Sequence, residues 1–124
     1  MSLRRARGIR AYARGMNAED AACAALVRDG WTILDCRVRT EAGEVDVLAD
    51  KDGLLAIIEV KARPTLAGAA VALSSRQQAR LLGAAECVLA AHPSWGANGV
   101  RFDLLLVDAA GSVRRIADAF RLEG

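Results

Sequence analysis

Charged side chains alternate with apolar ones along two short stretches of the chain, as Glu44 and Asp46 in the first and Glu59 and Lys61 in the second. Two carboxylates that lie close together suit a hard divalent cation, because Mg²⁺ prefers oxygen ligands and takes one or two carboxylates from a protein. Such a cation polarises a phosphate and lowers the pKa of an attacking water. A lysine on the same face can approach that water or the phosphate. These residue types are therefore suited to phosphodiester hydrolysis, provided that the fold brings them together.

The pair Asp52-Gly53 indicates how the fold would do so. Between runs rich in Val, Ile and Leu, Asp-Gly is a strong hairpin signal, because a type I′ turn needs φ > 0 at both central residues. With a two-residue loop, the register places Asp46 directly opposite Glu59. Strand side chains alternate with a period of two, so all four charged groups are expected on one face.

Like charges that are directly opposed destabilise a sheet, so Asp46 against Glu59 calls for a cation or a shared proton between them. The alternative is that this face is simply solvated. The same register places Glu44 opposite Lys61, where Glu44 would either belong to the ligand shell or form an ion pair with the lysine. Glu19, in the first turn of an expected helix, could reach this face as an outer ligand or as a partner for Lys61.

The pattern of apolar residues predicts one domain over residues 1–124, of mixed α/β class, with a mixed sheet flanked by helices. Asn17 is a good N-cap and Gly30 stands where a C-cap glycine belongs. In the first strand, Leu34, Cys36 and Val38 are expected to share one face. The expected elements are a helix over 18–29, a three-stranded meander over 31–62, a helix that begins at Ser74 or Ser75 with a Ser-x-x-Gln capping box and stops at Pro93, a parallel strand over 100–107, and a short edge strand over 113–116.

The first 16 residues are expected to form a basic arm or a short helix, in which Arg4, Arg5, Arg7 and Arg10 precede the first acidic residue. Such an arm is typical of nucleic-acid or anionic-surface binding, and the alternative is a solvated tail. No run approaches the roughly 18 apolar residues of a membrane span, and the arm lacks the apolar stretch of a secretory signal. A cytoplasmic protein without a membrane partner is expected.

The three cysteines and the single histidine indicate no further chemistry. Cys23, Cys36 and Cys87 lie far apart without a CxxC spacing, so they are expected to be small buried residues and not a zinc site or a disulfide frame. His92 precedes Pro93 and is expected to have a surface role at a helix end.

Asp46, followed after a hairpin's length by Glu59-x-Lys61, resembles the PD-(D/E)xK nuclease motif. The order α-β-β-β-α-β resembles the core of the restriction-endonuclease-like superfamily. More closely, the chain resembles the YraN-like family of small bacterial proteins, which is similar to archaeal Holliday-junction resolvases. The segments that carry this resemblance are Gly43-Glu-Val-Asp46, Glu59-Val-Lys-Ala-Arg63 and Arg101-Phe-Asp103, and it covers nearly the whole chain.

The resemblance implies that Asp46 and Glu59 bind Mg²⁺ or Mn²⁺, that Lys61 is the catalytic lysine, and that Glu19 is an additional acid. The chain departs from the family pattern at Gln77, where relatives commonly carry a lysine. Leu66 and Ala67 also replace an aromatic residue before the Gly68 position.

Contacts with phosphate come mainly from Arg, Lys and amide side chains. The candidates for such contacts, besides the arm, are Arg63, Arg76, Gln77, Gln78 and Arg80. Asp103, on a buried strand, is expected to be structural and bonded to Arg101 or to a helix end. The expected function is a metal-dependent endonuclease acting on DNA, with branched or structured DNA as a suitable substrate and a homodimer suited to its two-fold character. The alternatives are a non-catalytic nucleic-acid-binding module on the same fold, and an interaction domain whose arm meets acidic proteins or lipid head groups.

Overall fold

The computed structural model describes residues 17–67 and 73–120. The predicted basic arm with Arg4, Arg5, Arg7 and Arg10 lies outside these residues, as does the Gly68 position. The described elements are α2 (Ala18–Arg28), β1 (Thr32–Thr40), β2 (Gly43–Lys51), β3 (Leu54–Ala62), α3 (Ser75–Ala91), β4 (Val100–Val107) and β5 (Val113–Ile116).

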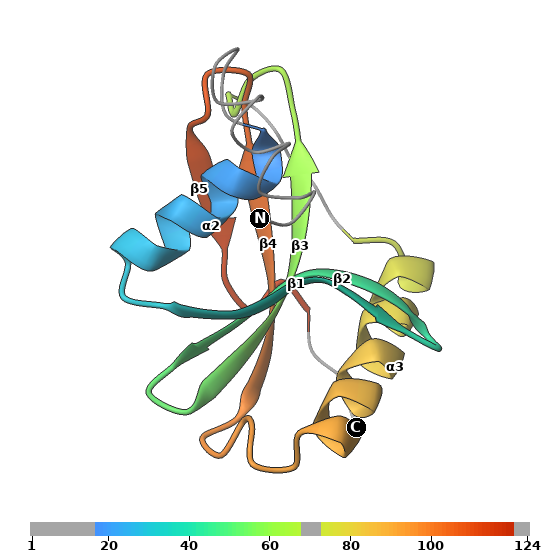
Figure 1. Cartoon of the computed structure of the whole chain (residues 1–124). Helices are drawn as coiled ribbons and strands as arrows, with labels where there is room; N and C mark the ends of the chain where they lie inside the picture. The colour runs from blue at the N-terminus through green and yellow to red at the C-terminus, as the bar shows by residue number, and fades with distance from the viewer. Residues whose placement is uncertain (1–16, 68–72, 121–124) are drawn as a thin grey trace, which may run out of the picture.

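The five strands form one mixed sheet in the order β1-β2-β3-β4-β5, with α2 and α3 on its two sides (Figure 1). β1, β2 and β3 are antiparallel neighbours, whereas β4 lies parallel to β3 and antiparallel to β5. α3 is the crossover between the two parallel strands. The predicted α/β class and the α-β-β-β-α-β order are therefore confirmed, with β5 added at the sheet edge. None of the described helices combines the length and apolar character that a membrane span requires.

Both described helices begin where the sequence predicts and end one or two residues before the predicted positions, because their caps are encoded locally. The Asn17 side chain accepts a hydrogen bond from the backbone N–H of Asp20 at 2.8 Å, and Gly30 follows the helix with φ +91°. At the start of α3, Ser74 Oγ accepts from the N–H of Gln77, and Gln77 Oε1 accepts from the N–H of Ser74. This capping box sets the N-terminal end of α3 beside the sheet.

The β2–β3 hairpin has the predicted two-residue turn. Asp52 and Gly53 have φ values of 52° and 85°, as a type I′ turn requires. The pairs run from Lys51 with Leu54 to Val47 with Ile58, so the predicted register is confirmed over this part of the hairpin.

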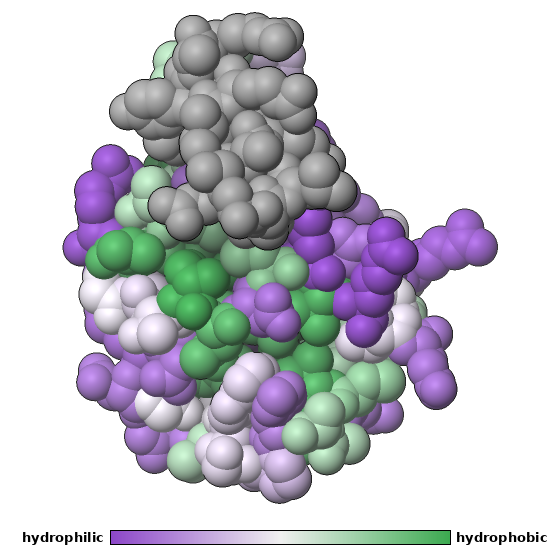
Figure 2. Space-filling model, in the orientation of Figure 1, coloured by the Kyte–Doolittle hydropathy of each residue, from purple (hydrophilic) through white to green (hydrophobic). Residues whose placement is uncertain are grey.

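Two apolar layers hold the helices to the sheet. Leu81 and Val88 of α3 pack on Leu48 and Ile57, and a second layer beneath α2 contains Ala22, Leu26, Val47 and Ile58. Full burial of a leucine or isoleucine side chain contributes about 1.5–3 kcal/mol, so the sheet is anchored on both faces. On the face seen in Figure 2, apolar surface runs across the middle of the molecule, and hydrophilic side chains gather on its right around the N-terminal end of α3 and the β1–β2 turn.

The prediction that Leu34, Cys36 and Val38 share one face of β1 is wrong. Leu34 and Val38 pack against the layer beneath α3, whereas Cys36 Sγ lies 3.9 Å from Cys23 Sγ on α2. A register shift between positions 33 and 35 and a φ of 51° at Arg37 break the alternation. The three cysteines are also half-buried and not fully buried, unlike the prediction.

Asp103 has the predicted structural role on β4. Its carboxylate is fully buried and accepts hydrogen bonds from Arg101 Nε and Nη2, both at 2.8 Å, and from the Asp118 N–H at 2.9 Å. This pairing raises the pKa of Arg101. The Arg101 guanidinium also lies 5.4 Å from the centroid of the Trp31 ring.

We expect Arg101→Met to lower the free energy of unfolding by about 3 kcal/mol, because the Asp103 carboxylate would stay buried without its partner. Arg115→Met is the control, since Arg115 lies over the same ring of Trp31 at 5.8 Å, and its loss should cost less than about 1 kcal/mol. Urea unfolding measures both values. An equal loss in the two variants would contradict the structural role of the Arg101–Asp103 pair.

Candidate active site

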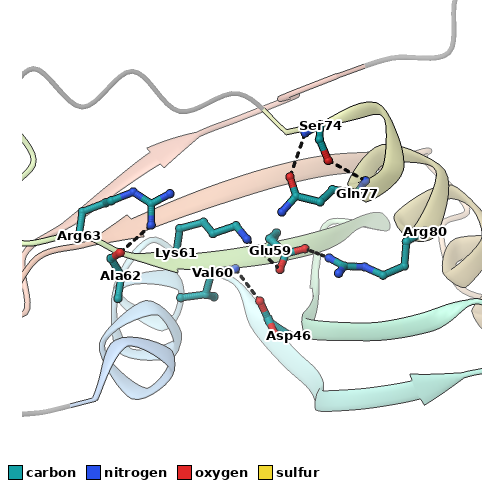
Figure 3. Close-up of polar contacts among 9 residues, drawn as sticks. All are labelled: Asp46, Glu59, Val60, Lys61, Ala62, Arg63, Ser74, Gln77 and Arg80. Carbon is teal, nitrogen blue, oxygen red and sulfur yellow. Dashed lines mark hydrogen bonds and ion pairs between the residues drawn. The ribbon is translucent and has the colours of Figure 1, made fainter.

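Asp46 lies at the point where β2 and β3 stop pairing. The last backbone pair is Val47 with Ile58, so the predicted backbone pair of Asp46 with Glu59 is not formed. Instead, Asp46 Oδ2 accepts a hydrogen bond from the N–H of Val60 at 2.7 Å (Figure 3). A side-chain oxygen thus replaces a backbone carbonyl as the acceptor on the side of β3 that faces β2. The bond leaves Oδ1 of Asp46 for another partner and orients the carboxylate toward β3.

Glu59 lies beside Asp46 and is nearly buried, with 8% of its surface exposed. Its Oε2 accepts a hydrogen bond from Arg80 Nη2 of α3, and its Oε1 lies 3.9 Å from Lys61 Nζ (Figure 3). Burial and the charge of Asp46 raise the pKa of Glu59, while Arg80 and Lys61 act in the opposite direction without cancelling that rise. The carboxylates and the lysine of the predicted cluster are therefore brought together.

The donor set suits a hard cation. The side chains of Asp46 and Glu59 offer carboxylate oxygens, and Mg²⁺ or Mn²⁺ would keep water or substrate oxygens at the remaining positions. In residues 17–67 and 73–120, no three His, Cys, Asp or Glu side chains converge as metal ligands. Asp46 and Glu59 thus offer two carboxylates, as many as Mg²⁺ usually takes from a protein.

Glu19 and Glu44 are the other acidic residues that the sequence relates to this site. Glu19 Oε2 accepts a hydrogen bond from Arg37 Nε at 3.1 Å, so the structure connects Glu19 to β1. The prediction that Glu44 lies on the same face as Glu59 fails, because Val45 packs beneath α3 and its neighbour therefore points to the other face. Glu44 is exposed, and the described side chains show no ion pair between Glu44 and Lys61.

Several candidates for phosphate contacts bond to the protein backbone. Gln77 Oε1 is part of the capping box, and Gln78 Nε2 donates to the Leu73 carbonyl at 2.9 Å. Arg63 Nη1 donates to the carbonyl of Ala62 at 2.7 Å. These contacts hold Arg63 just after the end of β3 and the two glutamines in the first turn of α3.

A surface hollow of about 550 Å³ adjoins the start of α3. It is lined by Ala42, Arg76, Gln77, Ala79 and Arg80, so two arginines face the same space. A second hollow, of about 640 Å³, lies between β1 and the C-terminal half of α3, with Val38, Leu48 and Val88 among its apolar lining. The carboxylate pair lines neither hollow, and only the first shares a residue, Arg80, with the site.

Sequence reasoning missed the ion pair between Arg80 and Glu59, having assigned Arg80 only to phosphate contact. A signal was present, because Arg80 stands four and eight residues before Ala84 and Val88, which are buried. A charged residue in line with a buried helical stripe indicates a partner inside the fold.

The raised pKa of Glu59 predicts how stability depends on pH. Between the usual value of 4.5 and the raised pKa, the folded state binds more protons than the unfolded state, so the free energy of unfolding falls as the pH rises. Glu59→Gln removes this titration. We therefore expect the stability of the native protein, relative to Glu59→Gln, to decline with rising pH through this window, as measured by urea unfolding in EDTA. Glu86→Gln, at an exposed carboxylate of α3, is the control. A stability of the native protein that rises with pH relative to Glu59→Gln would contradict the prediction.

The comparison with known proteins identifies the family. The model of the uncharacterised protein family UPF0102 matches residues 18–107. A UPF0102 protein of Granulibacter bethesdensis is 60% identical over 117 residues, covering 94% of this chain and 74% of that protein. A UPF0102 protein of Azorhizobium caulinodans is 46% identical over 114 residues, covering 92% of this chain and 87% of that protein. A UPF0102 protein of Rhodopseudomonas palustris is 40% identical over 112 residues, covering 90% of this chain and 86% of that protein. The chain therefore belongs to the UPF0102 family, in agreement with its YraN-like motifs.

Proposed function

We propose that this protein is a Mg²⁺- or Mn²⁺-dependent endonuclease that hydrolyses phosphodiester bonds of DNA. The observation that carries the proposal is the approach of Asp46 and Glu59 at the end of the β2–β3 pairing, with Lys61 Nζ 3.9 Å from Glu59. The same residues form the pattern that resembles the PD-(D/E)xK motif. The mixed sheet between two helices is consistent with a restriction-endonuclease-like core.

Each residue has a distinct task in this mechanism. The metal, when bound, would polarise the phosphate and lower the pKa of the attacking water. Asp46 and Glu59 provide the carboxylate oxygens, and the bond from the Val60 N–H keeps the Asp46 carboxylate in one orientation before substrate arrives. Lys61 assists the attacking water and offsets negative charge that develops on the phosphate.

Substrate contacts are proposed on the side of the site nearest α3. The hollow lined by Arg76 and Arg80 offers cations for a DNA phosphate, and the N-terminal end of α3 has no acidic residue in its first turn. The arginine-rich arm would add contacts to the backbone. The resemblance to Holliday-junction resolvases favours branched DNA, whose two-fold character suits a homodimer.

A non-catalytic nucleic-acid-binding module is the second candidate. It is favoured by the present partners of Glu59, because Arg80 and Lys61 already offset its charge, as in a purely structural cluster. The two candidates differ in whether a metal and DNA together lead to a broken phosphodiester bond.

The proposal predicts metal-dependent cleavage of labelled duplex, flap or four-way-junction DNA. Glu59→Gln removes a metal ligand and Lys61→Met removes the group that assists the water, so each should lower the cleavage rate at least about 100-fold. Rates would be measured with Mg²⁺ and with Mn²⁺, after circular dichroism has shown that the variants are folded.

Arg28→Gln, at an exposed position in the last turn of α2, should cleave like the native protein. Native protein that binds DNA but cuts none of these substrates with either metal would support the non-catalytic module. Cleavage that persists unchanged in both active-site variants would place the activity at another site or in a contaminant.

A further inference from the structure

Arg80 reaches Glu59 across the start of β2. Its guanidinium pairs with Glu59 Oε2, although the two residues lie on different elements of the fold (Figure 3). The absence of a side chain at Gly43 makes room for the Arg80 side chain, since a Cβ atom at this position would lie 2.6 Å from Arg80 Cδ. Gly43 also has φ +139°, a conformation that side-chain-bearing residues rarely adopt. The backbone of β2 is thus shaped to let the arginine stem lie against it.

The contact leaves Arg80 incompletely satisfied. Arg80 Nη2 donates to Glu59, but Arg80 Nε is buried and has no hydrogen-bond partner among the described residues. A buried donor without an acceptor costs free energy, whereas a phosphate can accept two parallel bonds from one guanidinium. Because Nε is buried in this position, an anion with several oxygens could satisfy the guanidinium only after it has moved away from Glu59.

The hollow of about 550 Å³ supplies room for such an anion. Arg80 forms one part of its lining and Arg76 another, and Gln77 lies between them on the first turns of α3. Arg80 consequently stands at the boundary between the carboxylate pair and a basic surface. A movement of the Arg80 guanidinium alone would take it from the carboxylate pair to the basic surface.

We propose that Arg80 is an internal counter-ion that competes with the divalent metal for Glu59, and that metal binding releases Arg80 toward a phosphate of the DNA. The inference rests on the proposed metal-dependent function and assigns a regulatory residue to that site. Two cations that share one carboxylate oppose each other, and by linkage the metal weakens the ion pair as much as the ion pair weakens metal binding. Removing Arg80 must then strengthen metal binding, which a purely structural ion pair would not do.

The test is the affinity of metal-free protein for Mn²⁺, measured by calorimetry without DNA. We expect Arg80→Gln to lower the dissociation constant for Mn²⁺ by at least about fivefold, the lower end of typical coupling between sites. Arg28→Gln removes an equal charge from an exposed position on α2 and should leave the affinity unchanged. A thermal melt in EDTA confirms that each variant is folded.

A measurement on the native protein gives an independent answer, and decides the matter if Arg80→Gln does not fold. Phenylglyoxal modifies accessible guanidinium groups, and mass spectrometry locates the modified arginine. Mn²⁺ should raise the rate at which Arg80 is modified and leave that of Arg28 unchanged. An unchanged or lower rate at Arg80 overturns the inference.

The outcomes separate the two proposals. Native protein that binds Mn²⁺, with equal or weaker binding by Arg80→Gln, overturns the role of Arg80 and leaves the proposed function standing. Absence of Mn²⁺ binding by both proteins at millimolar concentrations overturns the metal-dependent function and the inference with it. Binding by Arg80→Gln alone supports the inference, because the ion pair then excludes the metal from the native protein.

Discussion

The site depends on placing Glu59, which is buried, close to the half-buried Asp46. Glu59 is 8% exposed, and an ionised carboxylate in such a place is costly unless charged partners accompany it. Lys61 supplies one from the same strand, and Arg80 supplies the other from α3. The parallel crossover is what brings α3 to this position, so the arrangement of the sheet and the charge balance of the site are inseparable.

The end of the β2–β3 pairing gives Asp46 its orientation. In a continuous ladder, the Val60 N–H would bond to a backbone carbonyl, whereas here the Asp46 carboxylate accepts that bond. The break coincides with a change of face along β2, since Val45 packs beneath α3 and Val47 beneath α2. Arg37, which has a φ of 51°, lies on β1 between the residues that pair with Val47 and Val45. A local irregularity shared by two strands thus orients the Asp46 carboxylate toward β3.

Local rules explain why much of this fold could be predicted from the sequence. The turn at Asp52-Gly53 follows from backbone sterics, and the start of α3 follows from the reciprocal bonds of Ser74 and Gln77. The contact between Arg80 and Glu59 could not be predicted in this way, because it joins residues 21 positions apart and requires α3 to be docked. Pairwise alternation likewise places Glu44 on the wrong face, because it assumes a regular strand where the structure has a break. The predicted register therefore holds only as far as Val47 with Ile58, one pair short of Asp46 and Glu59, and tertiary packing decided the partners of Glu59.

The two carboxylates are held by different kinds of partner, and this difference bears on what the site can bind. Asp46 is fixed by a backbone N–H, which cannot leave without disrupting β3, whereas Glu59 is held by side chains that can move. With both acids ionised, Lys61 and Arg80 balance their charge, so the metal-free site has little net attraction for DNA. A divalent cation would make the same cluster positive and thereby complementary to phosphate. Affinity for the substrate at this point of the surface would then follow the metal, because the protein's own charges cancel without it.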